Sequence, residues 1–254
     1  MRPAYFDKYP TIAFERDDNG ILVMRLHSNG GPVVYQSQHH ADWTDAFYDI
    51  GRDRDNRLVI ITGTGDAFIN QINWDKPMDT PSDFETVHSE GKRLLRNLLD
   101  LEMPVIGAVN GPATIHAELA VLSDVTLASS TATFQDFPHF PYYTVPGDGV
   151  HIVWTELLGS NRGRYFLITG QTLNAQEALA LGVVNEVVEP GQLLPRAKEL
   201  ALQILQKPPL TVRYTRTCFT MRWKRLLEDG LGYGLAVEGL AAVDLAIKMK
   251  QAQK

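Results

Sequence analysis

The sequence of 254 residues lacks the features of a secreted or membrane-spanning protein. It holds a single cysteine, Cys218, which excludes an internal disulfide and fits a reducing compartment, so we expect a cytoplasmic protein. The opening MRPAYFDKYP contains charges and two prolines but no apolar stretch, which argues against a secretory signal. No run of about 18 uncharged apolar residues is present, and this predicts that no segment spans a membrane.

Positive charge is also scarce, because the formal net charge is −6 and the only dense basic run is RWKR at 222–225. A solvated helix face explains that run better than a phosphate contact, so we predict no nucleic-acid or membrane partner. The phosphate-loop ending GK[ST], the nucleophile elbow G-x-S-x-G and the zinc motif H-E-x-x-H are missing. The glycines of GTGDAF at 63–68 therefore predict a turn after a strand, and we expect no metal site.

Strand and helix patterns alternate over the first half of the chain. Helical spacing is present at 38–53 and again at 82–102, where Ser82 and Glu85 form a capping-box pattern that predicts the helix start. Alternation of this kind is typical of an α/β fold with a parallel or spiral sheet and helices outside it. The predicted strands are TIAFER (11–16), ILVMRLH (21–27), RLVIITGTG (57–65), MPVIGAVNG (103–111), VTLASS (125–130) and ATFQDF (132–137).

The pattern changes to helix alone near residue 191. An amphipathic stretch, GQLLPRAKELALQILQK, is followed by the helix breaker Pro208-Pro209 and then by a long helical tract. We therefore predict a core over residues 1–190 and a C-terminal helical region over 191–254 that packs on a neighbouring subunit.

The stretch FQDFPHFPYYTVPGDGV, residues 134–150, holds a histidine and an aspartate in a stiff backbone. His139 lies between two prolines, and Asp148 follows in a Pro-Gly-Asp-Gly turn. An imidazole titrates near ambient pH without help, which suits a general base, and a carboxylate beside it can fix one tautomer. Taken alone, each residue is also an ordinary turn former. The pair is therefore a candidate catalytic dyad whose assignment needs a second argument.

Several segments together resemble the crotonase (enoyl-CoA hydratase/isomerase) superfamily, and in order they cover nearly the whole chain. The resemblance implies a core of ββα spiral turns with C-terminal helices that mediate trimers, which often pair as hexamers. The segments are RLVIITGTGDAF (57–68), MPVIGAVNGPA (103–113), HAELAVLSD (116–124), ATFQDFPHF (132–140), the tract from VPGDG to VNEVV (145–188) and KPPLTVRYTRT (207–217).

Departures from the common pattern of the superfamily indicate a different substrate. NGPATIHAEL at 110–119 lacks the usual glycine cluster and has His116 in its place, and AFINQIN at 67–73 lacks the usual Gly and Asp. Pro138-His139 stands where hydratases carry a Pro-Glu pair with a catalytic glutamate. Lost backbone donors and a lost acid both argue against a CoA thioester.

These substitutions resemble one branch of the superfamily, 6-oxocamphor hydrolase and related β-diketone hydrolases. Members cleave a carbon–carbon bond between two carbonyl groups with water and do not use CoA. The branch's polar positions match His116, His139, Asp148 and Glu238, while Tyr35 stands where a tryptophan is often found. The resemblance thus implies a cofactor-independent hydrolase that converts a cyclic or bicyclic β-diketone to a keto acid, as a homotrimer or homohexamer.

Each of these residues has an expected role in a retro-Claisen hydrolysis. His139 would deprotonate water while Asp148 holds its tautomer, and His116, with Tyr35 as a second donor, would hold a carbonyl oxygen. Glu238 would orient water or the dyad, or carry a proton to the enolate carbon, and sequence does not choose between these. Aromatic residues of the same stretch are expected to line an apolar pocket and bind the substrate: Phe137, Phe140 and Tyr142.

Two other functions remain open at this point. One is a CoA-thioester hydratase or isomerase, and the other is a non-catalytic crotonase-fold scaffold that builds oligomers. A zinc site made by His116, His139 and Asp148 is a further alternative, disfavoured because no short paired-ligand spacing is present. The other histidines are interpreted as structural: His39, His40, His88 and His151.

Overall fold

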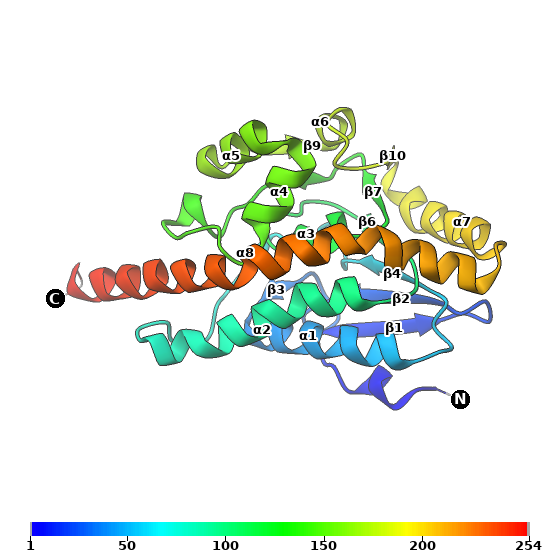
Figure 1. Ribbon diagram of the computed structural model, residues 1–254, viewed down its shortest axis with the longest axis horizontal. Helices are drawn as coiled ribbons and strands as arrows, with labels where there is room; N and C mark the ends of the chain where they lie inside the picture. Colours follow the sequence, from blue (N-terminus) through cyan, green and yellow to red (C-terminus); the bar gives the residue numbers. More distant parts are fainter. Residues whose placement is uncertain (1, 253–254) are drawn as a thin grey trace.

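The computed structural model describes residues 2–252 and centres on a six-stranded sheet (Figure 1). The strand order is β1-β2-β4-β6-β7-β10, and every neighbouring pair is parallel except the antiparallel β1 and β2. Parallel neighbours require a crossover connection, and helices supply several of these. The strands are β1 (Ile12–Arg16), β2 (Ile21–Leu26), β4 (Leu58–Thr62), β6 (Val105–Val109), β7 (Val125–Ser129) and β10 (Glu186–Val188).

Short strands form a second layer beside the main sheet. Ala113 bridges to Ile69 on one side and to Phe134 on the other, which joins the short pairs across successive turns of the chain. A long strand is thus followed by a short extended segment and then a helix, which is the expected ββα spiral and confirms the predicted fold. The short pairs are β3 (Val34–Tyr35) with β5 (Gln71–Ile72), and β8 (Thr133–Phe134) with β9 (Leu173–Asn174).

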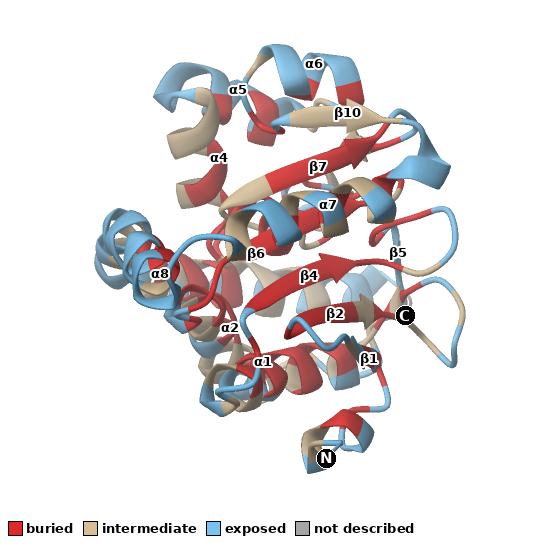
Figure 2. Cartoon of the chain, turned by 90° about the vertical axis from the view of Figure 1, so that its right-hand side faces the viewer, coloured by how far each residue is buried: buried red, intermediate tan, exposed pale blue. Residues whose placement is uncertain are grey.

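Helices cover both faces of the main sheet, and side-chain alternation along β2 shows why. Leu22 and Met24 point into the large core beneath the helices α1 and α2, whereas Ile21 and Val23 join a smaller core under α7 (Figure 2). The helices are α1 (Ser37–Arg52), α2 (Pro81–Asp100), α3 (Glu118–Val121), α4 (Val150–Leu158), α5 (Ser160–Thr169), α6 (Ala175–Ala180), α7 (Leu193–Leu205) and α8 (Pro209–Ala252), with short 3₁₀ segments η1 (Ala4–Asp7), η2 (Phe140–Tyr142) and η3 (Pro190–Gln192).

The start of α2 differs from the prediction. The N-cap is Thr80, whose hydroxyl accepts from the Asp83 backbone N–H at 3.2 Å while the Asp83 carboxylate accepts from the Thr80 N–H at 2.8 Å. Pro81 occupies the first helical position, where its missing N–H has no consequence. The capping box is therefore Thr80 with Asp83, and the predicted pair of Ser82 and Glu85 is wrong.

The helix α8 has 44 residues and begins at Pro209, so the predicted break at Pro208-Pro209 is confirmed. Leu227, Leu231 and Leu235 belong to the same core cluster as the sheet, and the helix packs along α2. Among residues 2–252, α8 is the one helix whose length and composition match a membrane span, with a window of mean hydropathy 1.4 that is 28% buried. Length and composition alone do not separate a span from a helix that other protein covers.

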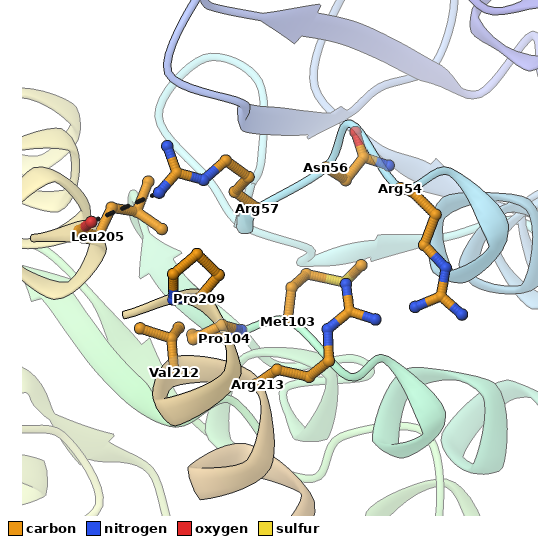
Figure 3. A pocket seen from close by; sticks show the side chains of 9 residues that line it. All are labelled: Arg54, Asn56, Arg57, Met103, Pro104, Leu205, Pro209, Val212 and Arg213. Atoms are coloured by element: carbon orange, nitrogen blue, oxygen red, sulfur yellow. Dashed lines mark hydrogen bonds between the residues drawn. The ribbon is translucent and has the colours of Figure 1, made fainter. Parts of the chain in front are cut away.

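A small cavity of about 220 Å³ lies near the amino ends of β4 and β6 (Figure 3). Its arginines already have partners within the chain. Arg54 and Arg213 pair with Glu102 at 3.3 and 2.9 Å, and Arg57 donates to the carbonyl of Leu205 at 3.4 Å. These contacts join the strand starts to α7 and α8.

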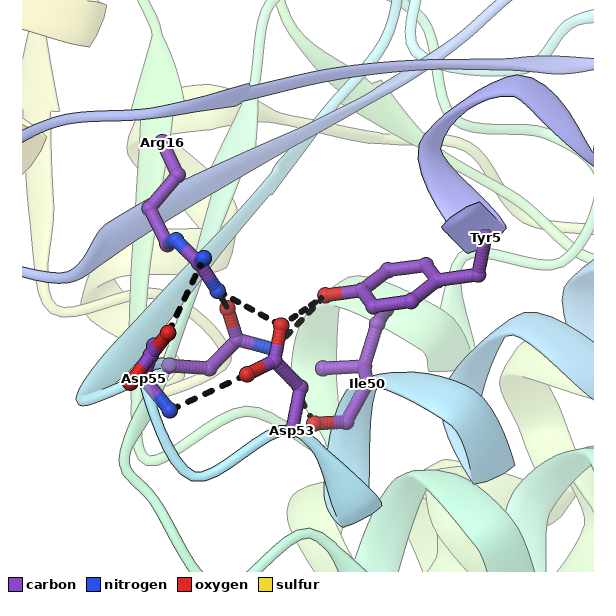
Figure 4. Close-up of polar contacts among 6 residues, drawn as sticks. Tyr5, Arg16, Ile50, Asp53 and Asp55 are labelled. Atoms are coloured by element: carbon purple, nitrogen blue, oxygen red, sulfur yellow. Dashed lines mark hydrogen bonds and ion pairs between the residues drawn. The ribbon is translucent and has the colours of Figure 1, made fainter. Parts of the chain in front are cut away.

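A buried polar network holds the N-terminal segment to the end of α1 (Figure 4). Arg16 pairs with Asp53 at 2.6 Å, and the Tyr5 hydroxyl donates to the same carboxylate at 3.1 Å. Asn56 donates to the Tyr5 hydroxyl at 2.9 Å and to the carbonyl of Ile50 at 3.0 Å. The network stabilises the chain away from the site described next.

Candidate active site

One cavity of about 560 Å³ brings the predicted catalytic residues together. It lies among the loops that follow β6 and β8, the loop before α4, and the C-terminal half of α8. Most of its wall is apolar, with polar groups gathered at one end. The wall includes His116, His139, Asp148 and Glu238, together with Tyr35 and Tyr142 from the predicted substrate-binding set.

Backbone pairing in the second layer positions the two catalytic segments next to each other. The carbonyls of Ala113 and Thr114 accept from the backbone N–H groups of Gln135 and Phe137, at 3.3 and 3.0 Å. The segment that carries the predicted base therefore lies alongside the segment that carries His116. Local pairing thus explains how residues of two separate spiral turns meet.

Two glycines let α8 approach the turn that carries Asp148. A Cβ added at Gly147 would lie 2.2 Å from the carbonyl oxygen of Gly234 and 2.7 Å from the Cβ of Glu238. A Cβ at Gly234 would lie 2.3 Å from the carbonyl oxygen of Gly147. Only glycine fits at either position, so this backbone contact allows Glu238 to lie close to His139 and Asp148.

His139 is bound at one ring nitrogen and faces the cavity with the other. Its Nδ1–H donates to Asp136 Oδ1 at 2.6 Å, whereas Nε2 lies 3.5 Å from Asp148 Oδ2 and 3.9 Å from Glu238 Oε1. Asp136 therefore takes the tautomer-fixing position that we expected for Asp148, which instead lies near Nε2 on the cavity side of the ring. Burial lowers the pKa of His139, but the charges of Asp148 and Asp136 outweigh burial and raise the pKa well above its usual value.

His116 repeats this arrangement on the neighbouring wall. Its Nδ1 lies 2.5 Å from Glu118 Oε1 and 3.9 Å from Asp148 Oδ2. Burial lowers the pKa of His116, and the Glu118 carboxylate outweighs it, so the net shift is upward and favours an imidazolium. The residue has φ 47°, a left-handed conformation that glycine adopts readily and histidine seldom does.

The two acids near His139 carry different charges at neutral pH. Burial raises the pKa of Glu238 to about 8, against the opposing charge of His139, so this group is mainly a carboxylic acid. Burial also raises the pKa of Asp148, but His139 and His116 outweigh it and the net shift is downward. The site thus pairs one proton donor with one carboxylate within reach of the same imidazole.

Tyr35 and His40 extend the polar end of the cavity. Tyr35 is buried with its ring 4.6 Å from that of His116, and burial, then Asp148, raises its pKa so far that the phenol stays neutral. His40, which the sequence analysis interpreted as structural, lines the cavity with Nδ1 held by Glu90 at 2.7 Å. Both hydroxyl and imidazole can donate to a substrate oxygen.

The carboxylates that hold the imidazoles were not predicted from the sequence. Asp136 precedes His139 by three residues and Glu118 follows His116 by two, and both spacings are visible in the sequence. Glu90 is remote in sequence from His40, so no local spacing indicates that pair. Short His–acid spacing was therefore the available signal, and it covers two of the three pairs.

The aromatic residues of the 134–150 stretch divide between cavity and surface. Tyr142 lines the cavity, but Phe137 and Phe140 do not, and their exposed fractions are 39% and 51%. Phe140 belongs to the short turn η2, which buries none of its residues. The structure therefore does not support the predicted role of Phe137 and Phe140 in substrate binding.

Two groups of side chains have the residue types and spacing of metal ligands, and they share Asp148. In each group the candidate ligand atoms lie within 4.8 Å of one another: His116, Glu118 and Asp148 in one, His139, Asp148 and Glu238 in the other. The same atoms are paired with each other as hydrogen bonds and ion pairs. We therefore derive no catalytic step through a metal.

Comparison with protein families identifies the fold's relatives. The family model described as enoyl-CoA hydratase/isomerase matches residues 16–233. The chain belongs to this family. Its membership in the crotonase superfamily, expected from sequence segments, is confirmed.

Two relatives of this chain are named as CoA-thioester hydratases. A crotonyl-CoA hydratase from Syntrophomonas wolfei is 33% identical over 82% of this chain and 80% of the relative. A short-chain-enoyl-CoA hydratase from Clostridium acetobutylicum is 35% identical over 66% of this chain, and the match spans 65% of that relative's length.

A solved structure resembles this chain over nearly its full length. It is a β-diketone hydrolase from the cyanobacterium Anabaena sp. PCC 7120 bound to (S)-3-oxocyclohexyl acetic acid, 49% identical, with a TM-score of 0.94 over 96% of this chain and 98% of that one. An enoyl-CoA hydratase/isomerase from Mycobacterium paratuberculosis shares the fold at 24% identity and a TM-score of 0.83.

Proposed function

We propose that this protein is a CoA-independent hydrolase that cleaves the carbon–carbon bond between the carbonyls of cyclic or bicyclic β-diketones. The observation that carries the proposal is His139, held by Asp136 at Nδ1 and presenting Nε2 to a cavity beside Asp148 and Glu238. Similarity to the Anabaena β-diketone hydrolase supports it independently. The product is a keto acid, and no cofactor is required.

Water activation falls to Nε2 of His139. Because Nδ1 donates to Asp136, Nε2 is the nitrogen that can take a proton from a water molecule in the cavity. Asp148, 3.5 Å from Nε2, orients that water and offsets the charge of the imidazolium as it forms. Hydroxide then adds to one carbonyl carbon, and the oxygen of that carbonyl becomes an oxyanion.

The remaining polar groups stabilise the oxyanion and protonate the leaving carbon. The His116 imidazolium and the neutral Tyr35 phenol donate hydrogen bonds to carbonyl oxygens. Collapse of the tetrahedral intermediate breaks the carbon–carbon bond, and the electron pair passes to an enolate spread over the second carbonyl. Glu238, protonated below about pH 8, supplies the proton that converts this enolate carbon to the ketone product, and the proton that His139 took from water then passes to Glu238, 3.9 Å from Nε2, which restores both groups. The predicted role of Glu238 is thereby narrowed to proton transfer.

A CoA-thioester hydratase is the second candidate, favoured by the similarity to crotonyl-CoA hydratase. The test is a direct comparison of rates with purified protein on bicyclic and monocyclic 1,3-diketones and on crotonyl-CoA. We expect keto-acid formation from a diketone and no hydration above background. Hydration of crotonyl-CoA at an enzymatic rate would overturn the proposal. No measurable turnover of either substrate class would support the alternative of a non-catalytic scaffold.

A further inference from the structure

The cavity continues well beyond the reacting groups, along one stripe of α8. Glu238, Ala242, Ala246 and Met249 follow one another at helical spacing, and all four line the cavity. At a rise of about 1.5 Å per residue, the stripe from Glu238 to Met249 is about 16 Å long. Two alanines in its middle leave the space beside the helix open.

The wall opposite α8 is mostly apolar, although Lys76 and Asp79 of the loop before α2 also line the cavity. Ile72 of β5, Met78 of the following loop and Val87 of α2 face this part of the cavity. Asp79 of the same loop pairs with Lys250 of α8 at 2.5 Å, which joins the two walls near the outer end. We call this region, bounded by Ala242, Ala246, Met249, Ile72, Met78 and Val87, the apolar track.

The reacting groups need only one end of this space. The two carbonyls of a β-diketone must lie beside His139 and His116, which together with Asp148 occupy the polar end. A volume of about 560 Å³ is in the range that holds drug-sized ligands, so a compact bicyclic diketone leaves the track unfilled. An apolar track continuous with a reaction site fits an aliphatic chain on the substrate.

Building on the proposed function, we propose that the preferred substrates are β-diketones that carry a linear aliphatic chain, which lies in the apolar track along α8. The diketone ring is placed at the polar end, and the chain extends from Ala242 toward Met249. Each methylene transferred from water to the track strengthens binding through burial of apolar surface.

The experiment measures kcat/KM for 2-methyl-2-alkylcyclohexane-1,3-diones, which have no acidic hydrogen at C2 and stay neutral, as the 2-alkyl group grows from methyl to octyl. We expect kcat/KM to rise about twofold to fourfold per methylene, as burial of a methylene predicts, and then to level off once the chain reaches the outer end. Turnover of the methyl compound tests the proposed function by itself. If every member of the series has the same kcat/KM, the proposed diketone cleavage is supported, but binding of an alkyl chain in the apolar track is contradicted.

A pair of variants tests the location of the chain. Ala246→Phe places a ring in the track, so the octyl-to-methyl ratio of kcat/KM is expected to fall at least tenfold. The control is Ile247→Phe at the adjacent residue, which is 44% exposed and does not line the cavity. In this variant the octyl-to-methyl ratio of kcat/KM is expected to remain unchanged. Equal ratios in both variants would place the chain elsewhere and overturn the inference. If no diketone is cleaved, the inference fails together with the function.

Discussion

Three imidazoles in the cavity each bind a carboxylate through Nδ1: His139 with Asp136, His116 with Glu118, and His40 with Glu90. This pairing decides which nitrogen of each ring is free to act on a substrate. The residues themselves were predictable for two of the three rings, since their positions match a family pattern. Their pairing was not, because it depends on which side of the ring each carboxylate approaches.

The first prediction concerns the base. His139→Ala removes the group that takes the proton from water, so kcat is expected to fall by about 10² to 10⁴ while KM changes little. Steady-state kinetics on a cleaved diketone measures both constants. An unchanged kcat would remove His139 from the mechanism.

The second prediction separates positioning from folding for Asp136. Asp136→Asn removes a charge that raises the pKa of His139, so the acid limb of the kcat/KM profile is expected to move to lower pH, with a loss in kcat of about tenfold or more. Exposed Asp45 on α1 provides the matched control Asp45→Asn, which should leave the profile in place. If Asp136→Asn lowers the melting temperature but leaves the acid limb of the kcat/KM profile at the same pH, the role of Asp136 is structural alone.

The third prediction is the shape of that profile for the unchanged protein. The base acts when unprotonated, and its pKa is raised, so activity should increase with pH through a value above the ordinary 6.5. Glu238 acts when protonated, so activity should decline above about pH 8. We expect a narrow optimum on the alkaline side of neutrality, and Glu238→Gln should remove the basic limb. A flat profile between pH 6 and 9 would contradict both assignments.

At the scale of elements, local rules predicted most strands and the break before α8. Buried β-branched runs became β2, β4 and β6, and Pro208-Pro209 separates α7 from α8 as expected. The start of α2 was predicted wrongly because Thr80 and Ser82 can both act as an N-cap. Pro81 favours Thr80, since a proline is well placed at the first helical position. Contacts between remote elements, such as that of Gly147 with Gly234, leave no local pattern in the sequence.

The fourth prediction tests that contact. Gly147→Ala places a Cβ 2.2 Å from the carbonyl of Gly234, so α8 must move away from the Asp148 turn. Overpacking of this kind costs about 1–3 kcal/mol, equivalent to several degrees in melting temperature for a chain of this size. We also expect kcat to fall, even at temperatures well below the melting temperature, because Glu238 moves with the helix. Gly191→Ala, where an added Cβ meets nothing within 4 Å, is the control for calorimetry and kinetics.

At the scale of the whole molecule, α8 links the core to the surface. Its buried face carries core leucines and Glu238, while Tyr233 and Leu240 on the same helix are 74% and 73% exposed. Large apolar side chains exposed in this way mark contact surfaces. The division at residue 190 and the trimer or hexamer stay predictions, because a single chain does not contain the partner that would cover this face.

The fifth prediction addresses that partner. Light scattering coupled to size exclusion should give the mass of three or six chains. Leu240→Glu places a charge on the exposed face and is expected to shift the population toward smaller species. The acidic control is Leu202→Glu on α7, where the leucine is 45% exposed. A monomer at micromolar concentration would exclude the predicted assembly.

The left-handed backbone of His116 sets a limit on how this molecule can be improved. A glycine would take φ 47° without penalty, whereas a side chain there carries strain of about 1–3 kcal/mol. Redesign guided by backbone preference alone would therefore choose glycine at this position, but glycine would leave the buried Glu118 carboxylate without its partner. The same choice would delete a hydrogen-bond donor that lines the cavity. The ion pair with Glu118 thus offsets the backbone strain of His116, and a design rule that considers only φ would remove an imidazole on which both stability and the cavity depend.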